Sequence, residues 1–485
     1  MSSLVNIRNN RIEKLKILKD MGINPYPAIS RRDFSLKEVS EKFDSLLKNK
    51  DIHLVGRVMS LREQGALIFL NIYDGTAKFQ GLIKKDEIGQ KEFDFFQKVI
   101  DIGDFIEIGG SLFTTKRGEK TMQISSWKML SKSLRPLPEK WHGLQDEEEK
   151  FRKRYLDILF NPEVKDMIEK KAKFWKAVRD FHINHGFLEV ETPVLENTTG
   201  GADANPFITH HNALDLDVYL RISAGELWQK RLMVAGFPKT FEIGRIFRNE
   251  GMSFEHLQDY TQCEAYWAYG DYKDMYNFLR ECYIYVAKET FGTLKFKIKG
   301  FDIDLEKEWP LIDYTEEIKK QTGIDIWNTN EKEIIKKLKE LKMEFDIKNK
   351  ERLIDTLWKY CRKNIAGPAI LINEPKTTSP LSKSCSDNPK LTERFHFIIA
   401  GSEIGQGYSE LNDPIDQMER FMEQAKLIEE GDKEAQMTDG EFVEAMEYGM
   451  PPTCGHGFSE RLFSFLMDKP IRECQIFPLL RPPKN

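Results

Sequence analysis

The sequence has 485 residues, of which 31% are charged and 40% hydrophobic, a composition that excludes a disordered chain and leaves room for two or three globular domains. No apolar run reaches the roughly 18 residues of a membrane helix, and the N-terminus lacks the apolar core of a secretory signal, so no membrane segment is expected. The net charge of −5 does not indicate nucleic-acid binding by the chain as a whole. Residues 1–140, however, carry 25 Lys and Arg against 18 Asp and Glu, which would favour a polyanion there.

The six cysteines are widely spaced and form no C-x-x-C pair. This usage favours free thiols in a reducing compartment over a zinc ribbon or a disulfide framework. We therefore expect a cytoplasmic protein.

Residues 8–21 are the first predicted element, a basic amphipathic helix in which apolar residues recur every three positions before Gly22 ends the pattern. The helix would either pack on a neighbouring element, which is the favoured interpretation, or contact RNA. Prolines then interrupt the chain, and a second polar helix is predicted near 35–48. Residues 1–50 are thus interpreted as an N-terminal helical extension.

Residues 51–134 consist of short alternating segments separated by glycine turns. Five strands at this spacing, with a helix at Glu92–Val99 before the fourth, predict a small Greek-key barrel of the OB type. Such barrels present aromatic and basic side chains to single-stranded nucleic acid. Four residues could make these contacts: Arg57, Arg62, Phe69 and Gln80. Phe69 could equally belong to the barrel core, because its apolar neighbours compete for the inward face.

The segment SLRPLPEKWHG has prolines and no periodicity, which predicts a domain boundary. We place a linker at 135–155 and a second domain at 156–485. The second domain begins with a long helix over 162–185 and a strand in GFLEVETPVL that Pro193 stops. His210 and His211 follow in another strand, where adjacent side chains point to opposite faces, so a structural role is favoured over metal binding.

Residues 241–272 contain the pattern that is most informative about function. Two alternating runs, separated by a break near Gly251, predict a β-hairpin. Charged and polar residues occupy positions where a half-buried sheet would be apolar: Arg245, Arg248, Glu250, Glu264 and Tyr266. Burying such charges without partners costs too much for them to be fillers. The favoured interpretation is the floor of a site for a charged ligand, and the alternative is a solvated outer face.

Residues 293–375 carry no chemical signal and are interpreted as a helical insertion. The strand pair that follows, ERFHFIIAGSEIGQGYSELNDP, holds acids at Glu403 and Glu410, and a glycine-broken strand then enters a helix at Arg461. No P-loop or G-x-G-x-x-G unit is present. ATP, if bound, would therefore lie on an antiparallel sheet with arginines on its phosphates rather than at a helix N-terminus.

Three segments resemble the motifs of one family. FEIGRIFRNEG with the following E-x-Y-x-A-Y-x-D-Y run resembles motif 2 of class II aminoacyl-tRNA synthetases in the lysyl form, GFLEVETPVL resembles motif 1, and GHGFSERLF resembles motif 3. The resemblance covers residues 8–482 except about 293–375. It implies an α+β fold, with an antiparallel-sheet catalytic domain and an N-terminal OB-fold anticodon domain. It also implies a homodimer formed through the motif 1 region.

The resemblance further implies that ATP activates lysine to lysyl-adenylate with release of pyrophosphate, and that lysine then passes to the 3′-terminal adenosine of tRNA(Lys). Arg248 and Arg461 match catalytic arginines, because the lysine carboxylate and the α-phosphate repel each other and need a bridging cation. The residues that match ATP contacts are Arg248, Glu250, His256, Tyr260, Glu403 and Arg461.

The residues that match lysine contacts are Gly201, Glu226, Arg248, Glu264, Tyr266, Gln406 and Glu410. Buried carboxylates suit an ammonium side chain and reject neutral or acidic ones. Glu403 matches a Mg²⁺ ligand, and His396 stands where the family has a second acidic ligand; Mg²⁺ prefers oxygen ligands.

The sequence also departs from the family pattern, which indicates a divergent branch. Gln406 replaces an asparagine, HLQDY replaces H-N-P-E-F, SAGE is one residue longer than A-P-E, and GHGFSER is one residue shorter than usual. Two other functions stay open. An aspartyl- or asparaginyl-tRNA synthetase would need a cation where Glu264 and Glu410 stand, and an amino-acid ligase outside translation or an RNA-binding module would share the scaffold alone.

Overall fold

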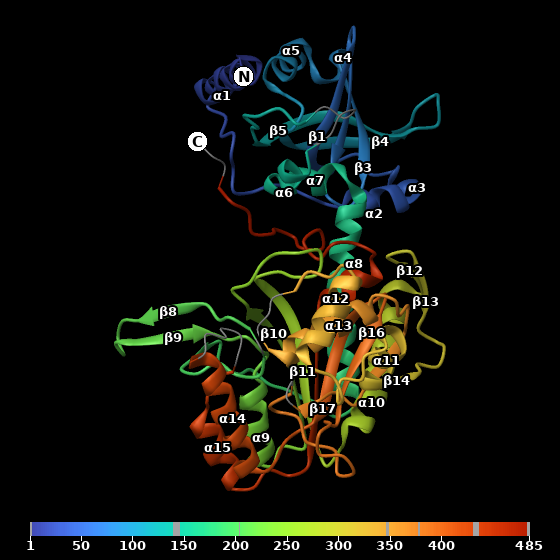
Figure 1. The fold of residues 1–485 in the computed structure, drawn as a ribbon. Helices are drawn as coiled ribbons and strands as arrows, with labels where there is room; N and C mark the ends of the chain where they lie inside the picture. The colour runs from blue at the N-terminus through green and yellow to red at the C-terminus, as the bar shows by residue number, and fades with distance from the viewer. Residues whose placement is uncertain are drawn as a thin grey trace. The chain divides into compact units, whose positions relative to one another are not determined.

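The computed structural model describes six stretches of the chain: residues 2–138, 146–202, 204–345, 349–376, 379–429 and 436–482. The chain divides into two units, Met1–Phe160 and Asn161–Asn485, each with its own hydrophobic core (Figure 1). Residues 139–145 of the predicted linker lie outside the described residues. Among the described helices, none combines the length and the apolar character that crossing a bilayer requires.

The first unit contains the predicted five-stranded barrel, closed in the order β1-β2-β3-β5-β4. Its strands are β1 Ile52–Gln64, β2 Leu67–Tyr73, β3 Lys78–Lys84, β4 Phe105–Thr114 and β5 Lys120–Ser131. The short helix α4 (Lys85–Ile88) and the predicted helix, α5 (Gln90–Val99), precede β4. Gly110 allows β4 to approach β5, since a Cβ at this position would lie 1.9 Å from the Gln123 oxygen.

The N-terminal helix α1 (Ser2–Asp20) packs on the barrel, as the favoured interpretation expects. Leu18 is buried in the barrel core. Arg11, 6% exposed, donates 3.0 Å hydrogen bonds to the backbone oxygens of Ile102 and Arg135. The predicted helix near 35–48 is instead two short helices, α2 (Leu36–Glu41) and α3 (Phe43–Leu46). The unit ends with α6 (Glu147–Arg152) and α7 (Arg154–Phe160).

The second unit is built on an eight-stranded sheet, which is antiparallel except for the pairs β14–β15 and β10–β6. In sheet order its strands are β14 Leu311–Asp313, β15 Ala369–Ile372, β16 Arg394–Ile399, β17 Ser402–Ser409, β18 Thr453–Ser459, β11 Asp259–Ala268, β10 Lys239–Phe247 and β6 Leu188–Glu189. The predicted hairpin is confirmed, because β10 and β11 pair from Lys239 opposite Trp267 to Phe247 opposite Asp259.

The two faces of this sheet differ in polarity. On one face, α8 (Pro162–Asn184) and α10 (Tyr272–Phe291) pack over the main hydrophobic core, which includes Cys263 and Ala265 of β11. Alternate residues of the same strand, among them Glu264 and Tyr266, face the other way, as the two-residue period of a strand requires. This polar face is bordered by α9 (Glu226–Val234), which contacts β11 and α15 (Gly440–Glu447).

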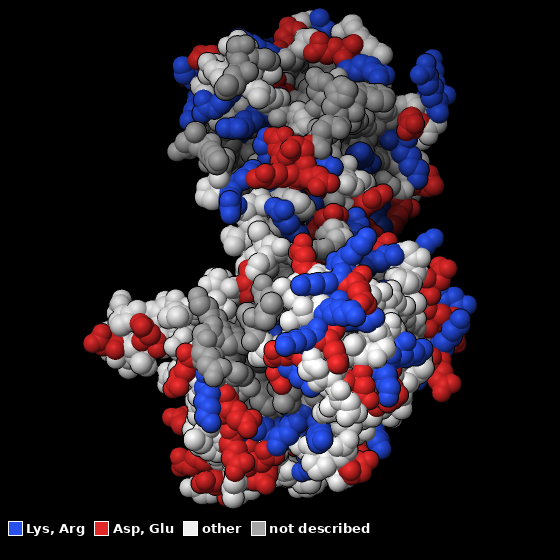
Figure 2. Space-filling model, in the orientation of Figure 1, with Lys and Arg blue, Asp and Glu red and all other residues white. Residues whose placement is uncertain are grey.

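Acidic side chains gather on the outer surface over α14 (Pro414–Glu429) and α15, whereas both signs of charge mix over the barrel (Figure 2). Beyond the main sheet, β7 (Leu195–Glu196), β9 (Leu216–Leu220) and β8 (Ile208–His211) form a small sheet of their own. Within it, His210 Nδ1 lies 2.9 Å from Asp217 Oδ1.

Two further predicted elements need correction. The segment 293–375 is not wholly helical, because it contains the hairpin β12 (Lys295–Ile298) and β13 (Phe301–Asp304) and the sheet strands β14 and β15 around the helices α11 (Tyr314–Thr322), α12 (Glu331–Glu340) and α13 (Lys350–Arg362). These strands have three or four residues each, too few for a clear alternation. The strand predicted in GFLEVETPVL is limited to β6, because Thr192 turns to bond Glu242 Oε2 at 3.0 Å.

Candidate active site

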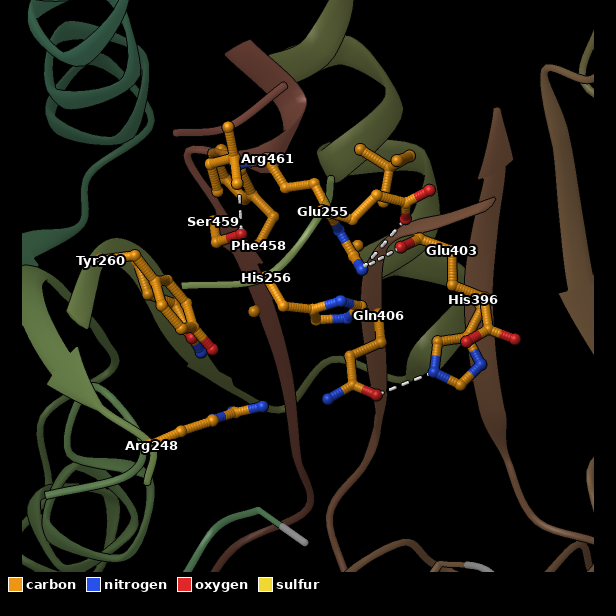
Figure 3. A pocket seen from close by; sticks show the side chains of 15 residues that line it. Arg248, Glu255, His256, Tyr260, His396, Glu403, Gln406, Phe458, Ser459 and Arg461 are labelled. Atoms are coloured by element: carbon orange, nitrogen blue, oxygen red, sulfur yellow. Dashed lines mark hydrogen bonds and ion pairs between the residues drawn. The ribbon is translucent and has the colours of Figure 1, made fainter. Parts of the chain in front are cut away.

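A cavity of about 250 Å³ lies on the polar face of the main sheet, beside the loop 249–258 (Figure 3). Seven of the predicted site residues line it: Arg248, His256, Tyr260, His396, Glu403, Gln406 and Arg461. They come from β11, β16, β17, the start of α16 (Arg461–Leu466) and the segment that joins β10 to β11. The fold therefore brings together residues that lie more than 200 positions apart in the sequence.

Arg461 points into the cavity between two acidic residues (Figure 3). Its Nη2 donates to the backbone oxygen of Glu403, and its Nη1 lies 3.6 Å from Glu255 Oε2. Burial lowers the pKa of Arg461, and Glu255 and Glu403 oppose that effect. A guanidinium whose ordinary pKa lies above about 12 stays charged under these conditions. The cavity thus contains a fixed cation suited to phosphate oxygens.

Glu403 is held by α13, in the segment for which the sequence predicted no chemistry. Trp358 Nε1 donates to Glu403 Oε1 at 2.6 Å, and Arg362 Nη1 lies 2.9 Å from Glu403 Oε2. Burial alone would raise the pKa of Glu403, but nearby cations, with His396 first, lower it to about 2. The sequence feature that could have identified Trp358 and Arg362 is their four-residue spacing, which places both on one face of an amphipathic helix.

His396 is engaged by protein oxygens at both ring nitrogens. Nδ1 lies 2.7 Å from Glu374 Oε1, and Nε2 lies 2.8 Å from Gln406 Oε1. Burial lowers the pKa of His396, but the carboxylates of Glu374 and Glu403 raise it more, so the net shift is upward. As arranged, His396 offers no free nitrogen to a metal. Among the described residues, no three His, Cys, Asp or Glu side chains form a metal-binding group.

Beside the cavity, α9, β11 and the residue that follows β17 together contribute a buried set of charges that we call the acid cluster: Glu226, Lys230, Glu264 and Glu410. Each of these residues is at most 4% exposed. Lys230 Nζ lies 2.7 Å from Glu226 Oε1 and 2.6 Å from Glu410 Oε2. Lys230 was not predicted, because its four-residue spacing from Glu226 on a helix looks like an ordinary exposed pair.

Glu264 accepts hydrogen bonds from three directions. The donors are Ala224 N at 2.9 Å, Gln262 Nε2 at 2.5 Å and Tyr266 Oη at 3.2 Å. Burial, followed by the charge of Glu226, raises the pKa of Glu264. The alternative of a solvated outer face is wrong for Glu264 and Tyr266, because each is only 3% exposed.

Gly201 adjoins the acid cluster. Its φ is +87°, and a Cβ would lie 2.8 Å from Glu226 Oε2 and 2.7 Å from Ser223 Oγ. A glycine therefore leaves room beside Glu226 that a side chain would fill. Gly455 does the same beside Glu410, where a Cβ would lie 2.5 Å from Oε1.

Two predicted floor residues lie apart from this site. Glu250 is exposed and does not line the cavity. Arg245, also exposed, is bonded to Asp259. Glu250 lies beyond the end of β10, so the alternation of the strand no longer determines its burial, and Arg245 lies within β10 with its side chain exposed.

Of the four barrel residues predicted to contact nucleic acid, three lie together and one lies apart. Arg62, Phe69 and Gln80 line a second cavity, of about 670 Å³, together with Lys116 and Arg117. Phe69 belongs to the outer surface rather than the core, because its neighbours Ile68 and Leu70 are each 1% exposed. Arg57 does not line this cavity and instead stacks its guanidinium 4.4 Å from the centre of the Phe105 ring.

Comparison with known proteins places this geometry in a family. Residues 146–481 match the family model of class II tRNA synthetases (D, K and N), and residues 52–130 match the model of the OB-fold nucleic acid binding domain. A lysine–tRNA ligase of Thermotoga maritima is 43% identical over 99% of this chain and 97% of its own length. Lysine–tRNA ligases of Thermosipho africanus and Thermoanaerobacter sp. strain X514 are 42% and 43% identical, with the same shares of each chain covered.

Proposed function

The chain belongs to the class II tRNA synthetases of the D, K and N group, within the lysine–tRNA ligases, and we propose how its cavity and its acid cluster divide the reaction. It ligates lysine to tRNA, and ATP is the substrate that drives the ligation. The cavity would hold ATP, and the acid cluster would hold lysine. The observation that carries this proposal is the burial of three carboxylates directly beside an arginine-lined cavity on one sheet.

In the first step, the lysine carboxylate attacks the α-phosphorus of ATP and pyrophosphate leaves. Arg248 would bridge the two anions, since its Nε is anchored by the backbone oxygen of Ile222 at 3.2 Å and its guanidinium lines the cavity. Arg461 would hold the γ-phosphate, which requires its contact with Glu255 to open. Tyr260, within the same cavity, offers a ring against which the adenine can stack.

The acid cluster would recognise both ammonium groups of lysine. Glu264, Tyr266 and Glu410 would take the ε-ammonium, and Glu226, with the space left by Gly201, would take the α-ammonium. An aspartate side chain would instead need an unpaired cation, and the neutral amide of asparagine would leave the buried carboxylates without a positive partner. Lys230 cannot supply that cation, because its ammonium is already paired with Glu226 and Glu410. This arrangement supports lysine over either rival substrate.

Mg²⁺ would supply charge neutralisation on the phosphates. Glu403 fits such an ion, since its low pKa keeps it ionised and each of its oxygens, bonded to Trp358 or Arg362, retains a second lone pair. His396 does not fit, because both of its nitrogens are engaged. A single protein ligand is therefore proposed in place of a pair.

The tRNA anticodon would bind the barrel at its second cavity, where Phe69 can stack a base and Arg62 and Gln80 can bind edges or phosphates. We also propose a homodimer formed through the motif 1 region and the small sheet. Leu188, Leu195 and Ile208 support it, since they are 48–64% exposed. Light scattering would then give twice the chain mass, and a monomer would contradict the dimer alone.

The direct test is amino-acid-dependent ATP–pyrophosphate exchange with each standard amino acid, with Mg²⁺ and without tRNA. We expect exchange with lysine alone. Exchange with aspartate or asparagine would mean that the acid cluster has been misinterpreted, and no exchange with any amino acid would support a binding module. Charging of tRNA(Lys) tests the second step separately.

A further inference from the structure

Lys230 occupies the acid cluster in a way that the reaction itself does not explain. Its side chain is 1% exposed and reaches from α9 to the end of β17, where its ammonium lies between Glu226 Oε1 and Glu410 Oε2. The ammonium also lies 5.4 Å from the centre of the Tyr408 ring. Burying an ammonium is costly unless it is paired, and here one cation is paired with two carboxylates.

Each carboxylate uses only one oxygen for Lys230. Glu410 Oε1 is buried and has no hydrogen-bond partner, and it faces the room left by Gly455. Glu226 Oε2 faces the room left by Gly201. The oxygens that do not bond Lys230 therefore lie against glycines, which bring no side chain to them, and the bonded oxygens point to the fixed ammonium.

The charges match the substrate. Three carboxylates and one ammonium leave two negative charges in the acid cluster, and lysine brings two ammonium groups. We propose that Lys230 is a positioning residue that serves as a fixed counter-ion: it orients Glu226 and Glu410 by one oxygen each and sets the residual charge to that of a substrate with two ammonium groups. This inference rests on the proposed lysine site.

Without Lys230, three carboxylates would share one buried space. Burial raises the pKa of Glu410, and Lys230 opposes that effect while Glu226 and Glu264 add to it. The other groups that face these carboxylates are the hydroxyls of Tyr266 and Tyr408, together with Arg248, whose charge acts on Glu264. Loss of the ammonium would therefore raise the pKa of Glu410 further, and the acid cluster would keep a proton up to a higher pH than in the wild type, a proton that lysine must displace.

The test is the KM for lysine in ATP–pyrophosphate exchange, measured for the wild type and Lys230→Met between pH 6.5 and pH 9. We expect the KM of the variant to exceed that of the wild type by about tenfold at pH 7 and by threefold or less at pH 9, with kcat changed little. Lys230→Arg keeps the charge, so its KM ratio to the wild type should not change with pH. The matched control is Arg231→Met. Arg231 lies next to Lys230 on α9, and this change removes its ion pair with Asp439.

A KM ratio for Lys230→Met that does not vary with pH, or tighter lysine binding at every pH, would overturn the proposal and leave a packing role. If Lys230→Met does not fold, Glu410→Gln is compared with the double variant Lys230→Met and Glu410→Gln, which removes both members of the pair. We expect the double variant to bind lysine as well as Glu410→Gln does. If Lys230 had only a packing role, its removal would lower the lysine affinity further. Wild-type exchange with lysine, measured first, separates a failure of this inference from a failure of the proposed function.

Discussion

The cavity and the acid cluster lie along the same face of β11 and β17, with α9 completing the acid cluster, but the cavity presents arginines whereas the acid cluster presents carboxylates. Along β11, every second residue from Tyr260 to Tyr266 faces the polar side, and the strand begins in the cavity and ends in the acid cluster. β17 also contributes to both regions, since Glu403 and Gln406 line the cavity and Tyr408 Oη donates a hydrogen bond to Glu226 Oε1 of the acid cluster. The cavity is open and arginine-lined, as a polyanion requires, whereas the acid cluster already contains its own cation. One sheet face therefore places a cationic region and an anionic region a few residues apart, as the proposed binding of ATP and lysine requires.

The largest loss of activity is expected for a change of Arg461, the cation held between Glu255 and Glu403 in the cavity. Arg461→Lys keeps the positive charge but loses the planar fork that fits phosphate oxygens, and we expect pyrophosphate exchange to fall by about 10³-fold. The thermal unfolding midpoint should change little, which circular dichroism can check. Arg245→Lys, at the exposed arginine bonded to Asp259, is the matched control and should retain activity within about twofold. Comparable losses in both variants would mean that the effect is not specific to the cavity.

The second effect tests the other end of β11. Glu264→Gln keeps the shape but removes a buried charge, and we expect the KM for lysine to rise by about 100-fold, with a smaller change in kcat. Because burial raises the pKa of Glu264, its carboxyl takes up a proton as the pH falls, and a protonated carboxyl no longer carries the negative charge that attracts an ammonium. The wild-type KM for lysine should therefore rise toward low pH, and that of Glu264→Gln should depend less on pH. An equally steep dependence in both proteins would assign the titration to another group.

How much the sequence predicts also differs between these two regions. The polar residues of β11 were predicted from the sequence pattern, because a period of two is visible there, whereas Glu403 and Gln406 of β17 were predicted only from the resemblance to the family. Trp358, Arg362 and Lys230 were not, because each lies on a helix whose pattern is that of ordinary amphipathic packing. Their partners are set by tertiary contacts across the sheet, which no local spacing encodes. The same limit explains why the short strands β14 and β15 were interpreted as part of a helical segment.

The third effect concerns the support of Glu403 by α13. Trp358→Phe removes the indole donor 2.6 Å from Glu403 Oε1 and leaves the ring in place. A hydrogen bond to a charged group is worth about 1.5–3 kcal/mol, so we expect about a tenfold rise in the Mg²⁺ concentration for half-maximal exchange. Trp327→Phe, at a tryptophan that is 43% exposed, is the control. An unchanged Mg²⁺ requirement would argue against Glu403 as the protein ligand of the metal.

The smallest effect concerns Glu255, an acidic residue that lies in the arginine-lined cavity rather than in the acid cluster. Glu255 lines the cavity, where its carboxylate accepts a 2.9 Å hydrogen bond from Ser402 Oγ and is paired with Lys299 and Arg461. Bound ATP would have to displace it from Arg461, and its charge repels the phosphates throughout. We expect Glu255→Gln to lower the KM for ATP by about threefold and to leave the KM for lysine unchanged. Asp259→Asn, which neutralises an exposed acid at the start of β11, should change neither constant. If Glu255→Gln raises the KM for ATP, Glu255 contributes to nucleotide binding, and the cavity and the acid cluster are less distinct than their charges indicate.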